Sequence, residues 1–138
     1  MVNQIDRYIN INPVDLNEEA AIGVTLPFNS DSVFNQSFTT KEAVKSNLIN
    51  VLLTFPGERV FEPEFGVGLK RLIFEQNIDE ESLKSNINDQ VGMYIPEIEI
   101  EDIDIKMVPD ENTLYIRLTY KFILDETYDS ISIQLNFK

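Results

Sequence analysis

Apolar and polar positions along this 138-residue chain follow a helical period in the middle and a period of two near the end. Thr39, with Glu42 three residues later, has the capping-box pattern that begins a helix. The apolar residues behind it recur every three or four positions and predict a helix over about residues 40–54 with one apolar face. They are Val44, Leu48, Val51, Leu52 and Phe55. Pro56 ends this helix because it lacks an amide donor, and Gly57 allows the positive φ of a helix terminus.

Two further helices are predicted downstream. Leu69, Leu72 and Ile73 indicate a short helix that ends near Phe74. Asp79 then caps a longer helix, and Pro96 ends it. The buried stripe of this longer helix is predicted to be Leu83, Ile87, Val91 and Tyr94.

From Glu97 onward the apolar residues alternate with polar ones, which is typical of strands with one buried face. The alternation slips by one residue at Glu101–Asp102, which predicts a β-bulge. Turns at 109–112 and 125–127 separate three strands. The inward-facing residues of the second and third strands are Leu114, Ile116, Leu118, Tyr120, Phe122, Ile131, Ile133, Leu135 and Phe137. We therefore predict an α+β fold, with helices packed on one face of a small antiparallel sheet and a C-terminal three-stranded meander.

The beginning of the chain lacks such a pattern. Residues 1–20 are polar and acidic, and we expect an N-terminal arm that is mobile in the isolated protein and ordered against neighbours in an assembly. Residues 22–28 form a short β-like run that Pro27 confines to a sheet edge, and residues 29–37 are predicted to be a loop. Residues 21–138 are expected to form a single domain.

The charge of the chain narrows the classes of partner. A formal net charge of −13 and a pI near 4.2 argue against nucleic acid, because phosphate binding needs clustered Lys and Arg. The charge suits either a basic partner surface or solubility alone. No cysteine is present, so disulfides and thiolate zinc sites are excluded. We expect no signal peptide and no membrane anchor, and therefore a protein made in a cytoplasm.

Candidate catalytic and metal sites are weak. Glu62 and Glu64 could suggest glycoside hydrolysis, but residues two apart in an extended loop point to opposite sides, and the chain has no histidine. Acidic residues at 102, 104, 125, 126 and 129 lack the twelve-residue calcium-loop pattern. Gly66-Val-Gly68 lacks the lysine and the third glycine of a nucleotide loop. We expect no enzyme activity, no metal and no cofactor.

The loop after the first helix is the most informative segment. It carries Glu58, Arg59, Glu62 and Glu64 around Pro63. Arg59 can form bidentate pairs with carboxylates, either as an internal strut of the loop or as part of a rigid knob offered to a partner. Three phenylalanines near this loop, Phe61, Phe65 and Phe74, are either core anchors or exposed contacts. Buried anchoring is commoner, so we expect at most one to face a partner.

These residues resemble a known family. The amphipathic helix, Gly57-Glu58-Arg59, Pro63-Glu64-Phe65-Gly66 and the following Leu69 look like the signature of the baseplate wedge family of contractile phage tails. That family was once called lysozyme-like and has a relative in the type VI secretion baseplate. The residues that match the family are concentrated in about residues 40–76. The chain departs from it in Phe55-Pro56, where a polar or basic pair is usual.

The resemblance implies a structural role in a contractile tail. It implies a virion protein that is assembled in the host cytoplasm into a sixfold baseplate. There the protein itself would join the wedge core bundle to the ring near tube and sheath. The expected partners are other baseplate wedge proteins and the tail sheath protein. Alternatives are a type VI secretion or related injection-system subunit and, less favoured, a tail-associated lysozyme. The residues expected to bind partners are Glu58, Arg59, Pro63, Glu64, Phe65 and Gly66 of the loop, and Ile131, Ile133 and Leu135 of the last strand.

The last strand enters this set because a meander leaves its final strand at an edge. Such an edge can accept an extended strand from another chain, here expected to come from the sheath. The first meander strand, at about residues 98–107, is the alternative edge, and its bulge would hinder pairing.

Overall fold

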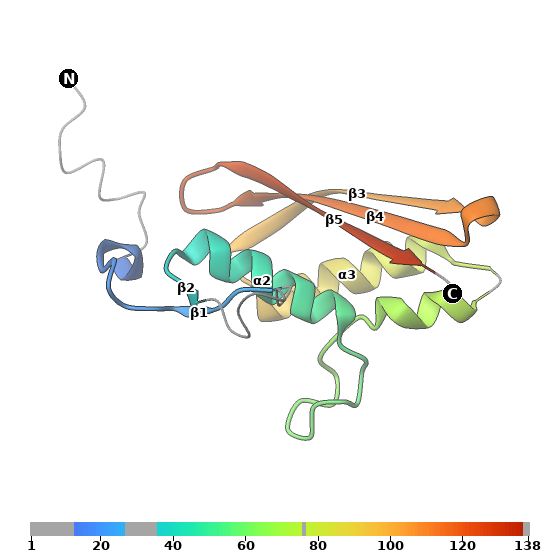
Figure 1. The fold of residues 1–138 in the computed structure, drawn as a ribbon, viewed down its shortest axis with the longest axis horizontal. Coiled ribbons are helices and arrows are strands. Elements are labelled where there is room, and N and C mark those ends of the chain that lie inside the picture. Colours follow the sequence, from blue (N-terminus) through green and yellow to red (C-terminus); the bar gives the residue numbers. More distant parts are fainter. Residues whose placement is uncertain (1–12, 27–35, 76, 137–138) are drawn as a thin grey trace.

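The computed structural model describes residues 13–26, 36–75 and 77–136 (Figure 1). The predicted long helices are α2, Thr40–Leu53, and α3, Glu80–Tyr94, and the meander is β3, β4 and β5. The strands span Ile98–Val108, Thr113–Phe122 and Tyr128–Asn136, with a short 3₁₀ helix η3, Pro109–Glu111, after β3. The remaining elements are η1, Pro13–Leu16, β1, Gly23–Val24, β2, Gln36–Ser37, and η2, Leu69–Phe74. The predicted α+β class is confirmed. Phe137 and residues 1–12 of the expected arm lie outside the described residues.

The molecule has two layers, as Figure 1 shows, with α2 and α3 side by side beneath one face of the β3–β4–β5 sheet. All neighbouring strands are antiparallel. The alternating apolar residues of β4 point into the space between the layers, and Leu114, Ile116, Leu118 and Tyr120 are all but fully buried there. Leu48 and Leu52 of α2 and Ile87 of α3 are equally buried from the other side. This shared core is what aligns the two helices and the sheet.

The predicted bulge is present in β3. Ile100 lies opposite Tyr120, but Asp102 lies opposite Thr119, so Glu101 is the extra residue. Because side chains alternate between faces, the inserted residue lets both Ile98 and Ile103 reach the core.

Helix α2 begins as predicted at Thr39, whose hydroxyl accepts a hydrogen bond from the Glu42 amide at 3.3 Å. The Glu42 carboxylate accepts from the amide of Phe38, one residue earlier than in the usual capping box. Asp15 of η1 adds a second cap, since it accepts from the amide and the hydroxyl of Thr40 at 2.6 and 2.8 Å. Part of the expected N-terminal arm is therefore tied to α2.

One local prediction was wrong and two were confirmed only in part. Residues 36–37, expected in a loop, form β2 and pair with β1, while the β-like run from residue 22 is reduced to Gly23–Val24 in the described part of the chain. Two-residue strands carry no period that a sequence pattern could reveal. The short helix at 69–74 is a 3₁₀ helix, and its φ-positive N-terminal neighbour is Gly68.

The turn between β4 and β5 is tied to the first turns of α2. Lys41 Nζ lies 2.6 Å from the Asp125 carboxylate and 2.9 Å from the Thr127 hydroxyl, and Lys45 Nζ lies 3.1 Å from Asp129. Burial raises the pKa of Asp125, but hydrogen bonds from Lys41 and Thr127 outweigh it and lower this pKa from 3.8 to about 2. We call these two ion pairs the hairpin clamp.

Candidate partner-binding surfaces

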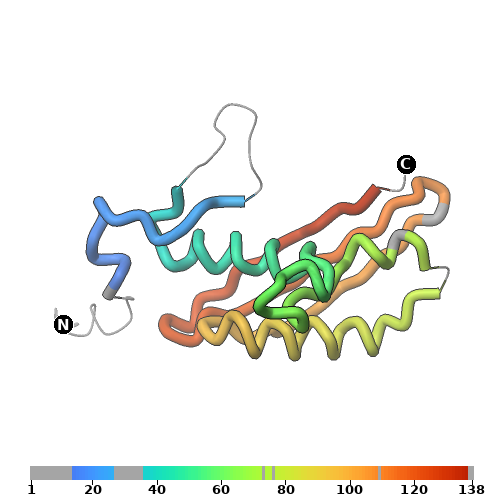
Figure 2. Tube along the Cα trace, turned by 90° about the horizontal axis from the view of Figure 1, so that it is seen from below, coloured from blue at the N-terminus to red at the C-terminus, as the bar shows by residue number. Residues whose placement is uncertain are grey.

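The segment that joins α2 to η2, residues 54–68, stands out from the two-layer body (Figures 1 and 2). We call it the α2–η2 loop. It begins where Leu53 ends α2, and it contains all six residues expected to form the loop contact. In Figure 2 the loop lies over the middle of the two helices, away from both termini.

Hydrogen bonds across the base of the loop hold its backbone. The Gly57 amide donates to the Pro63 carbonyl at 2.8 Å, and the Phe65 amide donates to the Glu62 carbonyl at 3.1 Å. The Glu58 carboxylate accepts from the Phe55 amide at 3.0 Å. The loop is therefore closed on itself before it meets any other element.

Helix α3 supplies the second support, through one side chain. The Gln90 amide oxygen accepts from the Gly66 amide at 2.8 Å, and its nitrogen donates to the Glu64 carbonyl at 2.9 Å. Helix α2 contributes through the Val51 carbonyl, which accepts from the Val67 amide at 2.9 Å. The C-terminal half of the loop is thus bonded to both helices.

Arg59 is engaged within the loop. Its Nη1 lies 3.0 Å from the Glu62 carboxylate, and its guanidinium lies 3.6 Å from the centre of the Phe65 ring. Phe65 is only 4% exposed and packs edge-on against Tyr94 of α3 at 4.7 Å between centroids. Arg59 therefore acts as an internal strut, one of the two roles left open by the sequence. Whether it also contacts a partner stays a prediction.

Close packing at residue 66, near the end of the loop, explains why this position is a glycine. Gly66 has a φ of 106°, and a Cβ there would lie 2.3 Å from the Thr54 carbonyl oxygen. No side chain fits this contact without moving the backbone. The glycine permits the last residues of the loop to lie directly against the end of α2.

The expected loop residues fall into two groups. Glu58, Pro63 and Glu64 are exposed, whereas Phe65 and Gly66 are buried. Of the three phenylalanines, Phe61 is 96% exposed and Phe74 is 86% exposed. The expectation that burial would prevail among them was wrong for these two, because Phe61 lies in the middle of the projecting loop and Phe74 at the end of η2, whereas Phe65 lies against Tyr94 of α3. Val60, beside Phe61, is 87% exposed.

The second candidate surface is the outer edge of β5, which the strand order leaves without a neighbour on one side in the described residues. Ile131 and Leu135 are buried, and Ile133 packs partly buried against the same core. The side chains expected to bind a partner strand therefore line the core, so such a strand would meet the backbone of β5.

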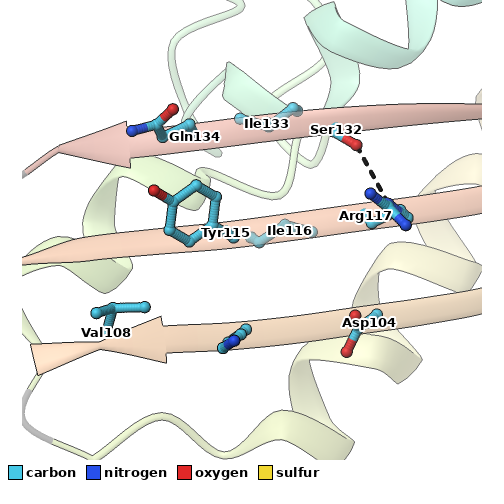
Figure 3. A pocket seen from close by; sticks show the side chains of 9 residues that line it. Asp104, Val108, Tyr115, Ile116, Arg117, Ser132, Ile133 and Gln134 are labelled. Atoms are coloured by element: carbon cyan, nitrogen blue, oxygen red, sulfur yellow. Dashed lines mark hydrogen bonds between the residues drawn. The ribbon is translucent and has the colours of Figure 1, made fainter.

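The outer face of the sheet differs between its two edges. Figure 3 shows Tyr115 and Arg117 of β4 beside Ser132 and Gln134 of β5, around a shallow hollow of about 500 Å³. Arg117 Nε donates to the Ser132 hydroxyl at 3.4 Å. The exposed residues of β5 on this face are uncharged: Tyr128 at its start, then serines, glutamine and asparagine. Strand β3 instead carries Glu99, Asp102, Asp104 and Lys106 beside its bulge.

Hollows that could hold a substrate contain few carboxylates available for chemistry. The hollow under the loop, about 210 Å³, is lined by Glu62 as its one carboxylate, and Glu62 is paired with Arg59. A hollow of about 330 Å³ beside η2 contains Glu75 and Asp79, but Arg71 pairs with the first and the second caps α3. Among residues 13–26, 36–75 and 77–136, no cluster of three acidic side chains could hold a metal ion. No helix in the same ranges is long and apolar enough to cross a membrane.

Comparison with known proteins places most of the chain in one group. A family model described as baseplate wedge protein gp25 matches residues 39–127. Baseplate wedge protein gp25 of Enterobacteria phage T4 is 28% identical over 95 residues, which are 67% of this chain and 71% of that protein.

Two solved structures are similar in fold. A chain of the sixfold-symmetrised baseplate of the anti-feeding prophage has a TM-score of 0.55 and 25% identity, with 73% of this chain and 81% of that chain covered. A protein from Geobacter sulfurreducens named as a tail lysozyme has a TM-score of 0.62 over 72% of this chain and 93% of its own. At 20% identity, this second likeness concerns the fold alone.

Proposed function

The chain belongs to the family of baseplate wedge protein gp25, and from this premise we propose that it joins two parts of a contractile tail. It is a structural baseplate wedge component of a contractile injection system. In the proposed arrangement the α2–η2 loop docks onto the helical core of the wedge, and the edge of β5 receives a strand of the tail sheath. Several copies act together in the baseplate of the finished tail, after assembly in the host cytoplasm.

The observation that carries the docking role is the bracing of the α2–η2 loop. Its backbone is bonded to itself at Gly57 and Phe65, to α2 at Val67 and to α3 through Gln90. A loop held in this way loses little conformational freedom on binding, so more of the contact energy appears as affinity. A loop that served only to connect α2 with η2 would need neither this bracing nor its projection from the body.

The sheath contact is supported by the asymmetry of the sheet edges. Natural proteins protect exposed edges with charges, prolines and bulges. The β3 edge carries a bulge and several charges, whereas β5 has Asp129 near its start and then an uncharged stretch from Ser130 to Asn136. An unprotected edge suits addition of a strand from another chain.

A catalytic role is not part of the proposal. Hydrolysis of a glycosidic bond needs a protonated acid and a second carboxylate across one sugar-binding cleft. Glu62 is held by Arg59, and Glu64 is exposed on a projecting loop. We therefore do not carry the name of the Geobacter sulfurreducens protein over to this chain. A type VI secretion baseplate is the alternative setting for the same role, and the particle with which the protein purifies distinguishes the two.

The test replaces residues 59–62 by Gly-Ser-Gly-Ser, a change we call the tip replacement. Cells that lack the wild-type chain express either version, and purified particles are assayed for the protein relative to another wedge component. We expect the tip replacement to fold but to be absent from baseplates. Normal incorporation at wild-type levels would overturn docking through this loop.

A further inference from the structure

We propose that Phe61, together with Val60, is the apolar anchor of the α2–η2 loop, and that it seats in an apolar pocket with a basic rim on a different baseplate protein. Arg59 braces this anchor and is not itself the principal contact. The inference rests on the proposed docking of the loop, and it assigns the roles within it.

Exposure singles out the anchor. Phe61 is 96% exposed and Val60 is 87% exposed at the part of the loop farthest along the chain from both of its ends. Phe65 and Val67 of the same loop are at most 4% exposed, and Phe55 at its start is partly buried. Two adjacent large apolar side chains held fully in water are unfavourable unless a partner covers them.

The bonds around the tip fix how the anchor is presented. Arg59 and Glu62, the residues immediately before and after Val60–Phe61, pair at 3.0 Å and so close the tip at its base. The Arg59 guanidinium also lies over Phe65, which is itself packed on Tyr94 of α3. Val60 and Phe61 are thus carried on a small closed turn that is anchored in the core. Aromatic residues in such fixed positions are typical of the few residues that dominate an interface.

The same contacts argue against Arg59 as the principal contact. One face of its guanidinium is taken by the Phe65 ring, and Nη1 is taken by Glu62. A partner carboxylate would meet a guanidinium whose charge is already balanced by Glu62, and whose side chain is only 40% exposed. The charge and one face of the Arg59 guanidinium therefore serve contacts inside the loop.

Charge identifies the kind of partner. Glu58 and Glu64 are exposed on the same loop, and Arg59 is neutralised by Glu62, so the surroundings of the anchor are acidic. A second copy of this chain, with a net charge of −13, would bring like charges together. The complementary surface is an apolar pocket bordered by Lys or Arg on another protein of the baseplate.

The test compares Phe61→Ser with Phe74→Ser in the particle assay described above. Both remove a phenylalanine that is more than four-fifths exposed, so neither should lower the melting temperature appreciably. We expect Phe61→Ser to reduce incorporation about 30-fold or more, the loss typical of a dominant interface residue. Phe74→Ser should be incorporated like the wild type.

Amide exchange tests the role of Arg59 separately. Arg59→Ala should speed exchange at the Gly57 and Phe65 amides, whose hydrogen bonds close the loop, whereas Phe61→Ser should leave both rates unchanged. Unaltered exchange in Arg59→Ala would overturn the bracing role.

The outcomes separate this inference from the proposed function. If the tip replacement is excluded but Phe61→Ser is incorporated normally, the loop docks without this anchor and the inference fails alone. If the tip replacement is also incorporated, docking through the loop fails with it. Equal losses for Phe61→Ser and Phe74→Ser would show a general effect of exposed aromatics and would also overturn the anchor.

Discussion

Gly66 is the residue at which the α2–η2 loop has least freedom to change. Its φ of 106° disfavours any side chain, and a Cβ would lie 2.3 Å from the Thr54 carbonyl oxygen. We predict that Gly66→Ala lowers the free energy of unfolding by about 2 kcal/mol or more, measured by denaturant titration. Gly57→Ala is the control, since its φ is 94° but no atom lies within 4 Å of the added carbon. A loss no larger than the control's would mean that the contact with Thr54 relaxes easily.

Gln90 is predicted to stabilise the fold through both the oxygen and the nitrogen of its side-chain amide. Gln90→Ala leaves the Gly66 amide and the Glu64 carbonyl without their partner, and we expect a loss of about 1–3 kcal/mol in unfolding free energy. Gln90→Glu keeps an acceptor for the Gly66 amide but sets a carboxylate oxygen against the Glu64 carbonyl, so it retains the first contact and loses the second. Amide exchange at Gly66 reads the same contact directly, and it should rise in the first variant more than in the second. Equal exchange in both would exclude Gln90 as the support of the loop.

Individual side chains were the hardest part to predict from sequence. Arg59 had two roles open because several glutamates lie near it in the sequence, and only the fold brings Phe65 beneath it. Phe61 and Phe65 look alike in the sequence, since the loop has no period. Phe65 is buried because Tyr94, 29 positions away, lies beside it, and no local pattern contains that information.

At the scale of elements, the hairpin clamp predicts a dependence of stability on acid. The pKa of Asp125 is about 2 in the folded protein against 3.8 for a free side chain, because the bonds to Lys41 and Thr127 outweigh its burial. A lowered pKa stabilises the fold fully above about pH 4, and this contribution is lost as the pH falls from 4 through 2. Asp125→Asn should therefore unfold more easily than the wild type at pH 7, by about 1 kcal/mol, since Lys41 is half-exposed.

The difference in stability between the wild type and Asp125→Asn should shrink as the pH is lowered toward 2. Thermal melting of both proteins across this pH range measures it. Glu126→Gln removes the same charge from the same turn outside the clamp and serves as the control. A difference that stays constant from pH 7 to pH 2 would rule out titration of Asp125 as its cause.

The edge of β5 allows a test that uses the alternation of hydrogen bonds in antiparallel strands. Of two successive residues, one directs its amide toward β4 and the other directs it away from the sheet. We therefore replace Ser132 and Ile133 by proline in two separate variants. One variant loses an amide that bonds to β4 and should melt early, and the other loses mainly an amide that points outward from the edge. We expect the second variant to enter baseplates but to fail in sheath attachment, scored by electron microscopy of tails. Normal sheaths on both would remove this edge from the contact.

Elements were predicted well where the period was long. Helices α2 and α3, the meander and the bulge at Glu101 all follow from spacing, because burial on one face requires that spacing. Strand β1 lies within the predicted β-like run at 22–28, but its partner β2 was missed because a two-residue strand carries no period. The 3₁₀ form of η2 was also missed, since Leu69 and Leu72 are three apart and suit either kind of helix.

For the whole molecule we predict that no lytic activity accompanies the structural role. The wild-type protein should leave purified peptidoglycan intact in a zymogram, and so should Glu62→Gln and Glu64→Gln. Among the described residues Glu62 is already paired, and the hollow beneath the loop is lined by this single carboxylate. Cleavage by the wild type that either substitution abolishes would contradict the structural assignment.

The contrast between the two edges of the sheet has a consequence for the protein before it meets its partners. Growth of a fibre by strand pairing needs two open strand edges on every subunit, so that each added subunit offers a free edge to the next. In the described β3–β4–β5 sheet, the bulge and charges of β3 disfavour pairing on that side, and the outer side of β5 is the open one. Two stray copies that met through β5 would form a self-complementary pair and use up the open side of both. Edge-to-edge pairing of newly made protein through this sheet would therefore stop at two copies, and the pair would have to separate before β5 could receive a strand in the tail.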